Sequence, residues 1–398
     1  MLKSVEEALN LIAAATQPLH AVRVPLTEAV HCVLAEPARA HFDLPRFTQS
    51  AVDGYALRHQ DLTALPQTLP LSGHVAAAAQ SQAPDLKPGT AMRILTGGML
   101  PTGADTVVRQ EKTRKRDAAI DIVEAVGPGT DIRPQGEECR EGSVIAKVGT
   151  LVTPALIAPL ATAGVENVSV RQPPRIVVLT TGDEIVSDGS KLRLGQIPDS
   201  NGPQLAAWLT SWGIPPLRVE HVPDHEADTR NALERAFADA DMVLSCGGVS
   251  VGDHDYIPAA ARAIGAREVL WKVAQKPGMP LFVAERAGRL LFGLPGNPGS
   301  VLVNLLIYVR TAILRMQGME PPREWSRFAT VKGETIQPEP TRVRWVRGII
   351  DYTDDGRCSF EALGGQASHM LGNLAQANAL ARIPRGSTAP TWVRWMPI

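Results

Sequence analysis

The spacing of apolar residues divides the chain into segments of different secondary structure. Residues 2–15 have helical spacing, and Ser4 followed by Glu7 predicts a capping box at the start of that helix. From about residue 44 to residue 140, short alternating runs are separated by Pro-Gly and Gly-Pro turns, which predicts a β-rich domain. Residues 141–172 predict a return connection, in which one helix lies between two strands.

Strand-like and helical runs then alternate from residue 173 to residue 321. Such alternation predicts a three-layer α/β/α domain with a mainly parallel sheet. The predicted strands are 176–179, 217–221, 242–244, 268–273, 281–284 and 290–293. The predicted helices are 203–212, 225–238, 256–264 and 300–316, with Ser200 or Asn201 capping the first and Asp224 capping the second.

A third pattern follows Pro321-Pro322, where alternating residues and frequent Gly and Pro turns predict a small β-barrel or sandwich. We interpret Arg342–Arg347 in this part as a strand with one solvent-exposed face rather than as a nucleic-acid site. The 398 residues are too many for one ordinary core. The sequence thus predicts a multidomain protein of four parts: a connecting domain (1–43 and 141–172), a β-rich insert (44–140), the α/β domain (173–321) and the C-terminal barrel (322–398).

Composition and charge favour a soluble protein of the cytoplasm. The formal net charge is −1, so no global field attracts nucleic acid or an anionic membrane. Glu6 and Glu7 argue against a signal peptide, and the apolar run 301–309 is too short to span a bilayer. The four cysteines show no metal-ligand spacing, which favours free thiols in a reducing compartment. Cys246 is interpreted as a small buried residue rather than as a nucleophile, because no dedicated base is near it in the sequence.

Three loops carry the chemistry that the sequence indicates. They are Thr180–Glu184, Ser245–Asp255 and Leu294–Pro298, and each follows a predicted strand of the α/β domain. Ligands bind at the carboxyl ends of strands in an open α/β sheet, where glycine lets backbone N–H groups approach an anion. Two of the loops also carry the carboxylates Asp183, Glu184, Asp253 and Asp255. Backbone donors and carboxylates together predict a phosphorylated ligand with a hard divalent cation.

Nine short segments of the chain, in order, resemble the MoeA family of molybdopterin molybdenumtransferases, to which the gephyrin E domain also belongs. The resemblance spans nearly the whole chain, and the nine together make it specific. The segments are Ser50-Ala-Val-Asp-Gly-Tyr-Ala56, Arg93-Ile-Leu-Thr-Gly97, Pro101-Thr-Gly-Ala-Asp105, Arg133-Pro-Gln-Gly-Glu-Glu138, Thr181-Gly-Asp-Glu184, Asp199-Ser-Asn201, Gly247-Gly-Val-Ser-Val-Gly-Asp-His-Asp255, Lys276-Pro-Gly278 and Leu294-Pro-Gly-Asn-Pro298.

The resemblance implies an activity and an assembly. Enzymes of this family take adenylylated molybdopterin and, with Mg²⁺, release AMP and place molybdate on the dithiolene. They are elongated homodimers, in which the α/β domain of one subunit and the β-rich insert of the other build each site. The connecting domain would then serve dimerisation, and contacts with the adenylylating protein and with cofactor carriers of molybdoenzymes are expected. The attacking oxygen, from molybdate or water, is not decided by the sequence.

The candidate site residues fall into groups by the chemistry that each residue type supplies. Gly247, Gly248 and Gly252 would let backbone approach the pterin phosphate, with Ser250 as a hydrogen-bond donor. Asp183, Glu184 and Asp255 are candidate catalytic carboxylates that hold Mg²⁺ or the substrate amine, although Asp255 could instead cap the next helix. Asp224 fits substrate binding and helix capping equally well. The remaining loop positions expected to bind substrate are Thr180, Gly182, Pro295, Gly296, Asn297 and Pro298.

Molybdate, as an oxyanion, requires cationic and hydroxyl donors. The candidates for this role are Lys272, Lys276, Arg347 and Ser368. Lys272 could equally be a solvated strand residue. By the resemblance, Asp53 would be catalytic and Thr96 would bind substrate, both reaching the partner subunit's site from the insert.

Two other functions remain open from the residues alone. One is a hydrolase of another pyrophosphate nucleotide, and the segments before residue 172 argue against it because such a module does not require them. The other is a pterin carrier or scaffold without turnover, which Mg²⁺-dependent product formation would distinguish from an enzyme. Tungstate in place of molybdate is also possible, since the two oxyanions share charge and shape.

Overall fold

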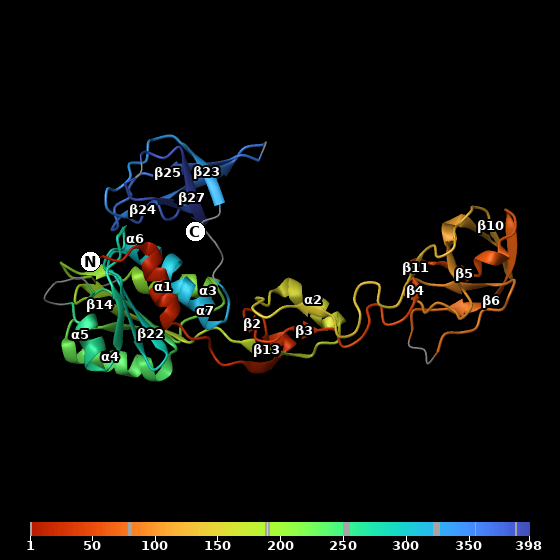
Figure 1. The fold of residues 1–398 in the computed structure, drawn as a ribbon, viewed down its shortest axis with the longest axis horizontal. Coiled ribbons are helices and arrows are strands. Elements are labelled where there is room, and N and C mark those ends of the chain that lie inside the picture. The colour runs from red at the N-terminus through yellow and green to blue at the C-terminus, as the bar shows by residue number, and fades with distance from the viewer. Residues whose placement is uncertain are drawn as a thin grey trace.

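The computed structural model describes residues 2–78, 82–187, 189, 192–249, 255–320, 327–354, 356–386 and 388–398. Figure 1 shows an elongated molecule with the α/β domain at one end, the β-rich insert at the other and a connecting domain between them. The C-terminal β domain lies beside the α/β domain, near the start of the chain. The multidomain fold with a central, mainly parallel sheet, predicted from the sequence, is therefore confirmed.

The α/β domain is built on one six-stranded sheet. Four neighbouring strands run parallel, the fifth runs in the opposite direction, and the sixth, at the edge, pairs antiparallel with the fifth. In spatial order they are β17 (Arg218–Val222), β14 (Ile176–Thr181), β18 (Met242–Cys246), β22 (Arg289–Leu294), β21 (Phe282–Arg286) and β19 (Arg267–Trp271). The central strands β14, β18 and β22 are almost wholly buried, as expected for a parallel sheet covered by helices on both faces.

Two separate cores lie on the two faces of this sheet. One contains α4 (Glu226–Asp239) and α5 (Ile257–Ala263). The other contains α1 (Val5–Ala15), α3 (Asn201–Ser211) and a long helix near residue 300. Because α1 packs into this second core, our assignment of the first residues to the connecting domain was wrong. The predicted capping box at Ser4 and Glu7 is confirmed, with both reciprocal hydrogen bonds present.

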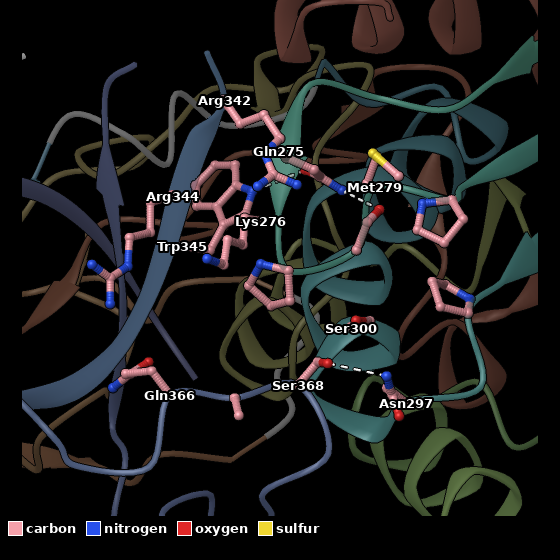
Figure 2. A pocket seen from close by; sticks show the side chains of 15 residues that line it. Gln275, Lys276, Met279, Asn297, Ser300, Arg342, Arg344, Trp345, Gln366 and Ser368 are labelled. Atoms are coloured by element: carbon pink, nitrogen blue, oxygen red, sulfur yellow. Dashed lines mark hydrogen bonds between the residues drawn. The ribbon is translucent and has the colours of Figure 1, made fainter. Parts of the chain in front are cut away.

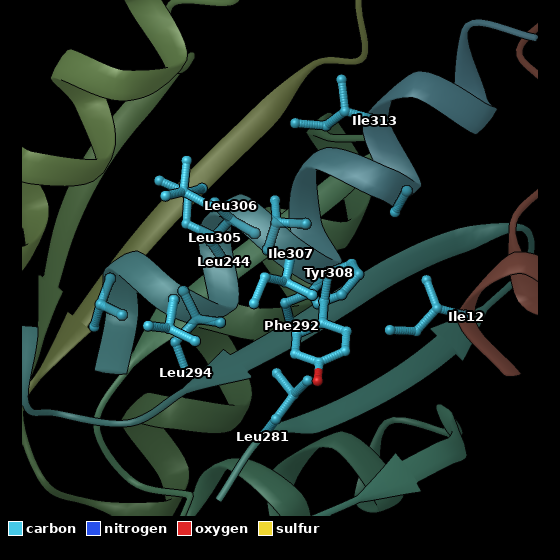
Figure 3. Close-up of a cluster of buried hydrophobic side chains, with 14 of the residues drawn as sticks. Ile12, Leu244, Leu281, Phe292, Leu294, Leu305, Leu306, Ile307, Tyr308 and Ile313 are labelled. Atoms are coloured by element: carbon cyan, nitrogen blue, oxygen red, sulfur yellow. The ribbon is translucent and has the colours of Figure 1, made fainter. Parts of the chain in front are cut away.

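The long helix is the centre of the larger core, as Figure 3 shows. It comprises α6 (Pro298–Asn304), a π-helical turn (Leu305–Val309) and α7 (Arg310–Met316). By length and composition Pro298–Met316 could cross a membrane, but 78% of its most apolar window is buried inside the protein. Its apolar faces therefore contact the sheet and α1 (Val5–Ala15), as in a core helix.

The connecting domain and the insert are separate β structures. The connecting domain contains β1 (Val22–Pro25), β2 (Val33–Leu34), β3 (Ala38–Arg39), β12 (Val144–Ala146), α2 (Pro154–Thr162) and β13 (Asn167–Arg171). A small pair of strands, β4 (Gln49–Ser50) and β11 (Ile132–Arg133), joins it to the insert. The insert sheet has the order β8 (Thr106–Arg109), β5 (Gly54–Leu57), β7 (Ala91–Ile94), β6 (Gln67–Val75), β10 (Ala119–Ile122) and β9 (Thr113–Lys115).

The C-terminal domain is a closed five-stranded barrel, which confirms the barrel prediction. The ring runs through β24 (Val343–Tyr352), β25 (Cys358–Ala362), β23 (Arg327–Lys332), β27 (Trp392–Pro397) and β26 (Ala379–Ile383), and β26 pairs back to β24. A short strand of the α/β domain, β20 (Gln275–Lys276), adds to β24 in parallel. This pairing places the barrel beside the carboxyl ends of the parallel strands.

Candidate functional site

The three predicted loops meet at the carboxyl ends of β14, β18 and β22, which are neighbours in the sheet. Together they surround a cavity of about 710 Å³, here called the strand-end pocket. It is lined by Thr180, Thr181, Gly182, Glu184, Ile185, Ile197, Pro198, Asp199, Ser200, Asn201, Asp224, Cys246, Gly247, Gly248, Asp255, Gly296, Asn297, Pro298, His369 and Leu371. The structure thus brings most of the predicted substrate positions into one cavity.

Glycine is required at position 247 by the close approach of two loops. Its φ is +92°, and a Cβ there would lie 2.6 Å from Oγ1 of Thr181. The N–H of Gly247 donates to the carbonyl of Leu294, so this group holds the second and third loops together. Gly247 therefore contributes by its shape rather than by its own donor. Ser250 and Gly252, also predicted to contact the phosphate, lie outside the described residues.

Four carboxylates line the strand-end pocket: Glu184, Asp199, Asp224 and Asp255. Asp183 does not line it. Instead, Oδ1 of Asp183 accepts from the backbone N–H of Asp224 at 3.1 Å, and the N–H of Asp183 donates to Oδ2 of Asp224 at 3.4 Å. The two residues therefore join the loop after β14 to the loop before α4. No group of three potential ligands that could hold a metal occurs within the described ranges.

The helix caps differ from the predictions. His225, not Asp224, is the N-cap of α4, and Tyr256, not Asp255, is the N-cap of α5. Ser200 occupies the N-cap of α3 without a side-chain bond, and Oδ1 of Asp199 instead accepts from the N–H of Gly202 at 2.9 Å. Neither Asp224 nor Asp255 occupies the N-cap position of its helix, and both line the strand-end pocket.

Asp199 and Asn201 were not predicted as site residues, although both lie in one of the matching motifs. Nδ2 of Asn201 donates to the carbonyl of Gly296 at 2.7 Å, which ties the start of α3 to the loop after β22. Its Oδ1, like Oγ1 of Thr180, is buried without a hydrogen-bond partner among the described residues. Buried polar atoms normally have partners. Neither atom is accessible from the cavity in this structure, although both residues line it.

A second cavity of about 470 Å³ lies between the α/β domain and the barrel, and is called here the interdomain pocket (Figure 2). Its lining carries the cations Lys276, Arg342 and Arg344, with the hydroxyls of Ser300 and Ser368 opposite. The two cavities share Asn297, whose Nδ2 donates to Oγ of Ser368 at 3.1 Å. A cationic pocket therefore adjoins the acidic strand-end pocket through one side chain.

A buried polar network supports the floor of the interdomain pocket. Oε1 of Gln275 accepts from the Tyr308 hydroxyl at 2.8 Å and from Nε1 of Trp345 at 2.9 Å. Nε2 of Gln275 donates to the carbonyl of Gly278 at 2.8 Å and to Oδ1 of Asn304 at 2.7 Å. The network therefore joins the Lys276–Gly278 turn to the long helix and to β24 of the barrel.

Arg347 lies beneath the loop that carries Ser368 rather than in the pocket lining. It is 2% exposed, and its guanidinium donates to the carbonyls of Met370, Gly365 and Ala367. The described residues provide it with no carboxylate partner. Its three loop contacts position Ser368, and its unneutralised charge raises the local positive potential. Its predicted contact with molybdate is therefore indirect in this conformation.

Gly299 shows how closely the Ser368 loop approaches the long helix. Its N–H donates to the carbonyl of Ser368 at 2.9 Å. A Cβ at this position would lie 2.9 Å from that carbonyl oxygen and 3.1 Å from Nη1 of Arg347. The sequence signal for this contact is the Gly that follows the Leu294–Pro298 motif, which we did not single out.

Lys272 and the insert residues lie apart from both pockets. Nζ of Lys272 lies 5.1 Å from the centre of the Trp271 ring, and Lys272 lines neither cavity. In the insert, Oδ1 of Asp53 accepts from the N–H of Thr96 at 2.7 Å and from its hydroxyl at 2.8 Å. The insert is at the far end of the molecule from the α/β domain (Figure 1), so these two residues cannot reach the pockets of their own chain.

The cysteines are unpaired, as expected. Cys246 lines the strand-end pocket, but it is 2% exposed and burial raises the pKa of its thiol well above the ordinary value. A thiol with a raised pKa is a poor nucleophile at neutral pH. This result agrees with its interpretation as a small buried residue.

An α/β domain that places an acidic, glycine-lined pocket beside a cationic one is typical of enzymes acting on phosphorylated small molecules. Three family descriptions match successive parts of the chain: the MoeA N-terminal region (domain I and II) at residues 3–164, a probable molybdopterin binding domain at 177–315 and the MoeA C-terminal region (domain IV) at 331–394. The chain belongs to the MoeA family, and its activity is that of a molybdopterin molybdenumtransferase in molybdenum cofactor biosynthesis.

The similar proteins cover the full architecture. The molybdopterin molybdenumtransferase of Nostoc sp. is 36% identical over 89% of this chain and 83% of its own length. Molybdopterin molybdenumtransferase 2 of Mycobacterium tuberculosis is 34% identical over 96% of each chain. Among solved structures, the molybdopterin biosynthesis MoeA protein of Pyrococcus horikoshii is 26% identical, has a TM-score of 0.80 and covers the whole of both chains.

Proposed function

We propose that the strand-end pocket binds adenylylated molybdopterin, that the interdomain pocket binds molybdate, and that the enzyme releases AMP with Mg²⁺ while transferring molybdenum to the dithiolene. The observation that carries this proposal is the contiguity of the two pockets. Asn297 lines both, and its bond to Ser368 at 3.1 Å joins their walls. A phosphorylated ligand in one cavity and an oxyanion in the other would thus meet at one side chain.

The strand-end pocket suits a phosphate-bearing ligand. Its walls are backbone turns at three strand ends, and the helix that begins at Pro298 runs from its rim to Met316. The N-terminus of a helix favours a negative ligand group.

The donor set also fits Mg²⁺. Glu184, Asp224 and Asp255 offer carboxylate oxygens in one cavity, and no cluster of three converges among the described residues. Mg²⁺ commonly takes one or two carboxylates and completes its shell with water and substrate phosphates. The bound ion would neutralise the bridging phosphates of the substrate. Asp183 would act indirectly, by positioning Asp224. Each of the two residues accepts the backbone N–H of the other with its carboxylate.

The interdomain pocket suits a tetrahedral dianion. Lys276, Arg342 and Arg344 supply positive charge and Ser300 and Ser368 supply hydroxyl donors. The oxyanion would be oriented by these groups beside Asn297. Arg347 would stabilise the site through its buried charge and its hold on the Ser368 loop.

We further propose that the enzyme is a homodimer in the cytoplasm. Asp53 and Thr96 are joined to each other but lie at the opposite end of the molecule from the pockets of their own chain. A second copy would bring its insert to the strand-end pocket and complete the site. Contact with the adenylylating protein and with cofactor carriers would follow from the substrate and product of this step.

The test is AMP release from adenylylated molybdopterin by the purified enzyme, with and without Mg²⁺ and molybdate. We expect release to require both ions and to fall about 100-fold or more in Asp255→Ala, in the range that loss of a charge-stabilising group produces. Asp228→Ala, an exposed carboxylate in the first turn of α4, is the matched control and should leave the rate unchanged. Tight pterin binding without AMP release under any condition would contradict the proposal.

A further inference from the structure

Two of the three cations that line the interdomain pocket share one carboxylate. Lys276, Arg342 and Arg344 line the cavity, and Glu339 forms ion pairs with the first two of them. Nζ of Lys276 lies 2.6 Å from Oε1 of Glu339, and Nη2 of Arg342 lies 3.4 Å from Oε2. The hydrogen bond from Lys276 lowers the pKa of Glu339, so the carboxyl is ionised at neutral pH.

The backbone places Glu339 opposite Lys276 through two fixed contacts. Lys276 lies in β20, and its register partner in β24 is Arg344, whose side chain donates to the carbonyl of Gln337. The carbonyl of Glu339 accepts from the N–H of Gly386 at 3.0 Å. The Glu339 side chain is 20% exposed, while that of Lys276 is 54% exposed. Of the two partners, Lys276 is therefore the one with room to turn towards the cavity.

We propose that Glu339 sets the oxyanion affinity of the enzyme: its carboxylate holds Lys276 while the interdomain pocket is empty, and a tetrahedral oxyanion displaces it from Lys276 on binding. The inference rests on the proposed function of this pocket. A carboxylate and an oxyanion compete for the same ammonium donors, so each bond that Glu339 keeps is lost to the ligand. When the oxyanion leaves in the transfer reaction, Glu339 regains Lys276 and the site returns to its starting state.

The magnitude follows from the exposure of the pair. An exposed ion pair stabilises only weakly, so its loss is a modest penalty on binding. Glu339→Gln keeps the shape and an acceptor oxygen but removes the charge. We expect its molybdate affinity to rise about three- to fivefold, which is about 0.7–1 kcal/mol at 1.4 kcal/mol per factor of ten. The gain should shrink as ionic strength rises, because salt screens exposed pairs.

The experiment is calorimetric titration of molybdate into the purified full-length enzyme without pterin. Glu334→Gln is the matched control, since it removes the same charge from an exposed position in the same segment. Tighter binding in Glu339→Gln with unchanged binding in Glu334→Gln supports the inference. Equal gains in both variants would overturn it, because they would show a long-range charge effect rather than competition at Lys276.

Two further outcomes separate this inference from the proposed function. If the wild type binds molybdate and Ser368→Ala weakens that binding, but Glu339→Gln binds no more tightly, the inference is wrong and the oxyanion pocket stands. Weaker binding in Glu339→Gln would likewise overturn the inference, since it would make Glu339 a support for Lys276. If the wild type binds no molybdate, both ideas fail.

Discussion

The buried amide of Gln275 joins three parts of the molecule, so replacing it should affect both stability and the interdomain pocket. In Gln275→Leu the Tyr308 hydroxyl and Oδ1 of Asn304 each lose a partner, and Nε1 of Trp345 loses this acceptor. Gln275, Asn304 and Tyr308 are each 0% exposed, so water cannot replace the bonds without rearrangement. A buried polar group without a hydrogen-bond partner lowers stability by about 1–3 kcal/mol. We expect Gln275→Leu to lower the free energy of local unfolding by about 3–5 kcal/mol in total.

Tyr308→Phe is the graded comparison. It removes one hydroxyl, and Oε1 of Gln275 keeps its bond from Trp345, so no acceptor is left without a donor. A single hydrogen bond contributes about 0.5–1.5 kcal/mol, which sets the expected cost. Tyr352→Phe, in the same strand as Trp345 but 62% exposed, is the matched control and should cost almost nothing.

The assay must report on this part of the fold, because a chain of four domains does not unfold in one step. Native-state hydrogen exchange over residues 275–279 and 300–308 measures the free energy of local opening. Molybdate affinity, measured by titration in mild conditions, reports on the pocket above the network. If Gln275→Leu lowers the free energy of local opening no more than Tyr308→Phe does, the buried groups that we expect to lose their partners have not lost them. Unchanged molybdate affinity would refute the link to the pocket.

Two other predictions concern the assembly and the acid stability of the sheet. Mixing inactive Asp53→Ala and Asp255→Ala subunits should restore about a quarter of wild-type AMP release, because half of randomly formed dimers are mixed and each has one intact site. No recovery, with mixed dimers demonstrated by mass, would contradict a shared site. Burial opposes ionisation of Asp241, but hydrogen bonds from the side chain and backbone of Arg175 outweigh it and lower its pKa. The stability from this pair is therefore present above the unfolded-state pKa of about 3.9 and is lost as pH falls through the folded value. Asp241→Asn should cost about 1 kcal/mol at pH 7, and that cost should shrink as pH falls below about 3.9, measured by native-state hydrogen exchange of β14 and β18 at each pH.

Much of the α/β domain followed from local patterns. The strand runs in β14, β18 and β22 are continuous and apolar, and Gly or Pro marks the turns after them, so the positions of these strands and loops were predictable. The capping box at Ser4 was predicted because its two partners are three residues apart. The cap of α4 was misplaced by one residue, and the capping alternative for Asp255 was likewise one residue from the N-cap of α5, since many polar residues fit such a position and only φ and ψ distinguish them.

The barrel strand around Arg347 shows a different limit. Alternation puts Arg347 on the same side of the strand as the buried Val343 and Trp345, and its guanidinium is accommodated there because the loop of residues 365–370 offers three carbonyls. No local pattern records a loop that lies about twenty positions away. Likewise, Gln275 carries no motif of its own, and its role depends on Tyr308 and Trp345, which come from distant parts of the chain.

The sequence by itself determined the elements, the family and the loops that bear the chemistry, because these depend on residue types at short spacing. Only the tertiary structure decided that α1 joins the α/β core, that Asp183 faces Asp224 and that Glu339 pairs with Lys276. Asp183 and Asp224 are 41 positions apart in the chain, and Lys276 and Glu339 are 63 positions apart. The Asp183–Asp224 pair forms only when the α/β domain has packed, and the Lys276–Glu339 pair forms only when the barrel has packed against that domain. In both cases tertiary packing, and not local conformation, sets the distance between the side chains.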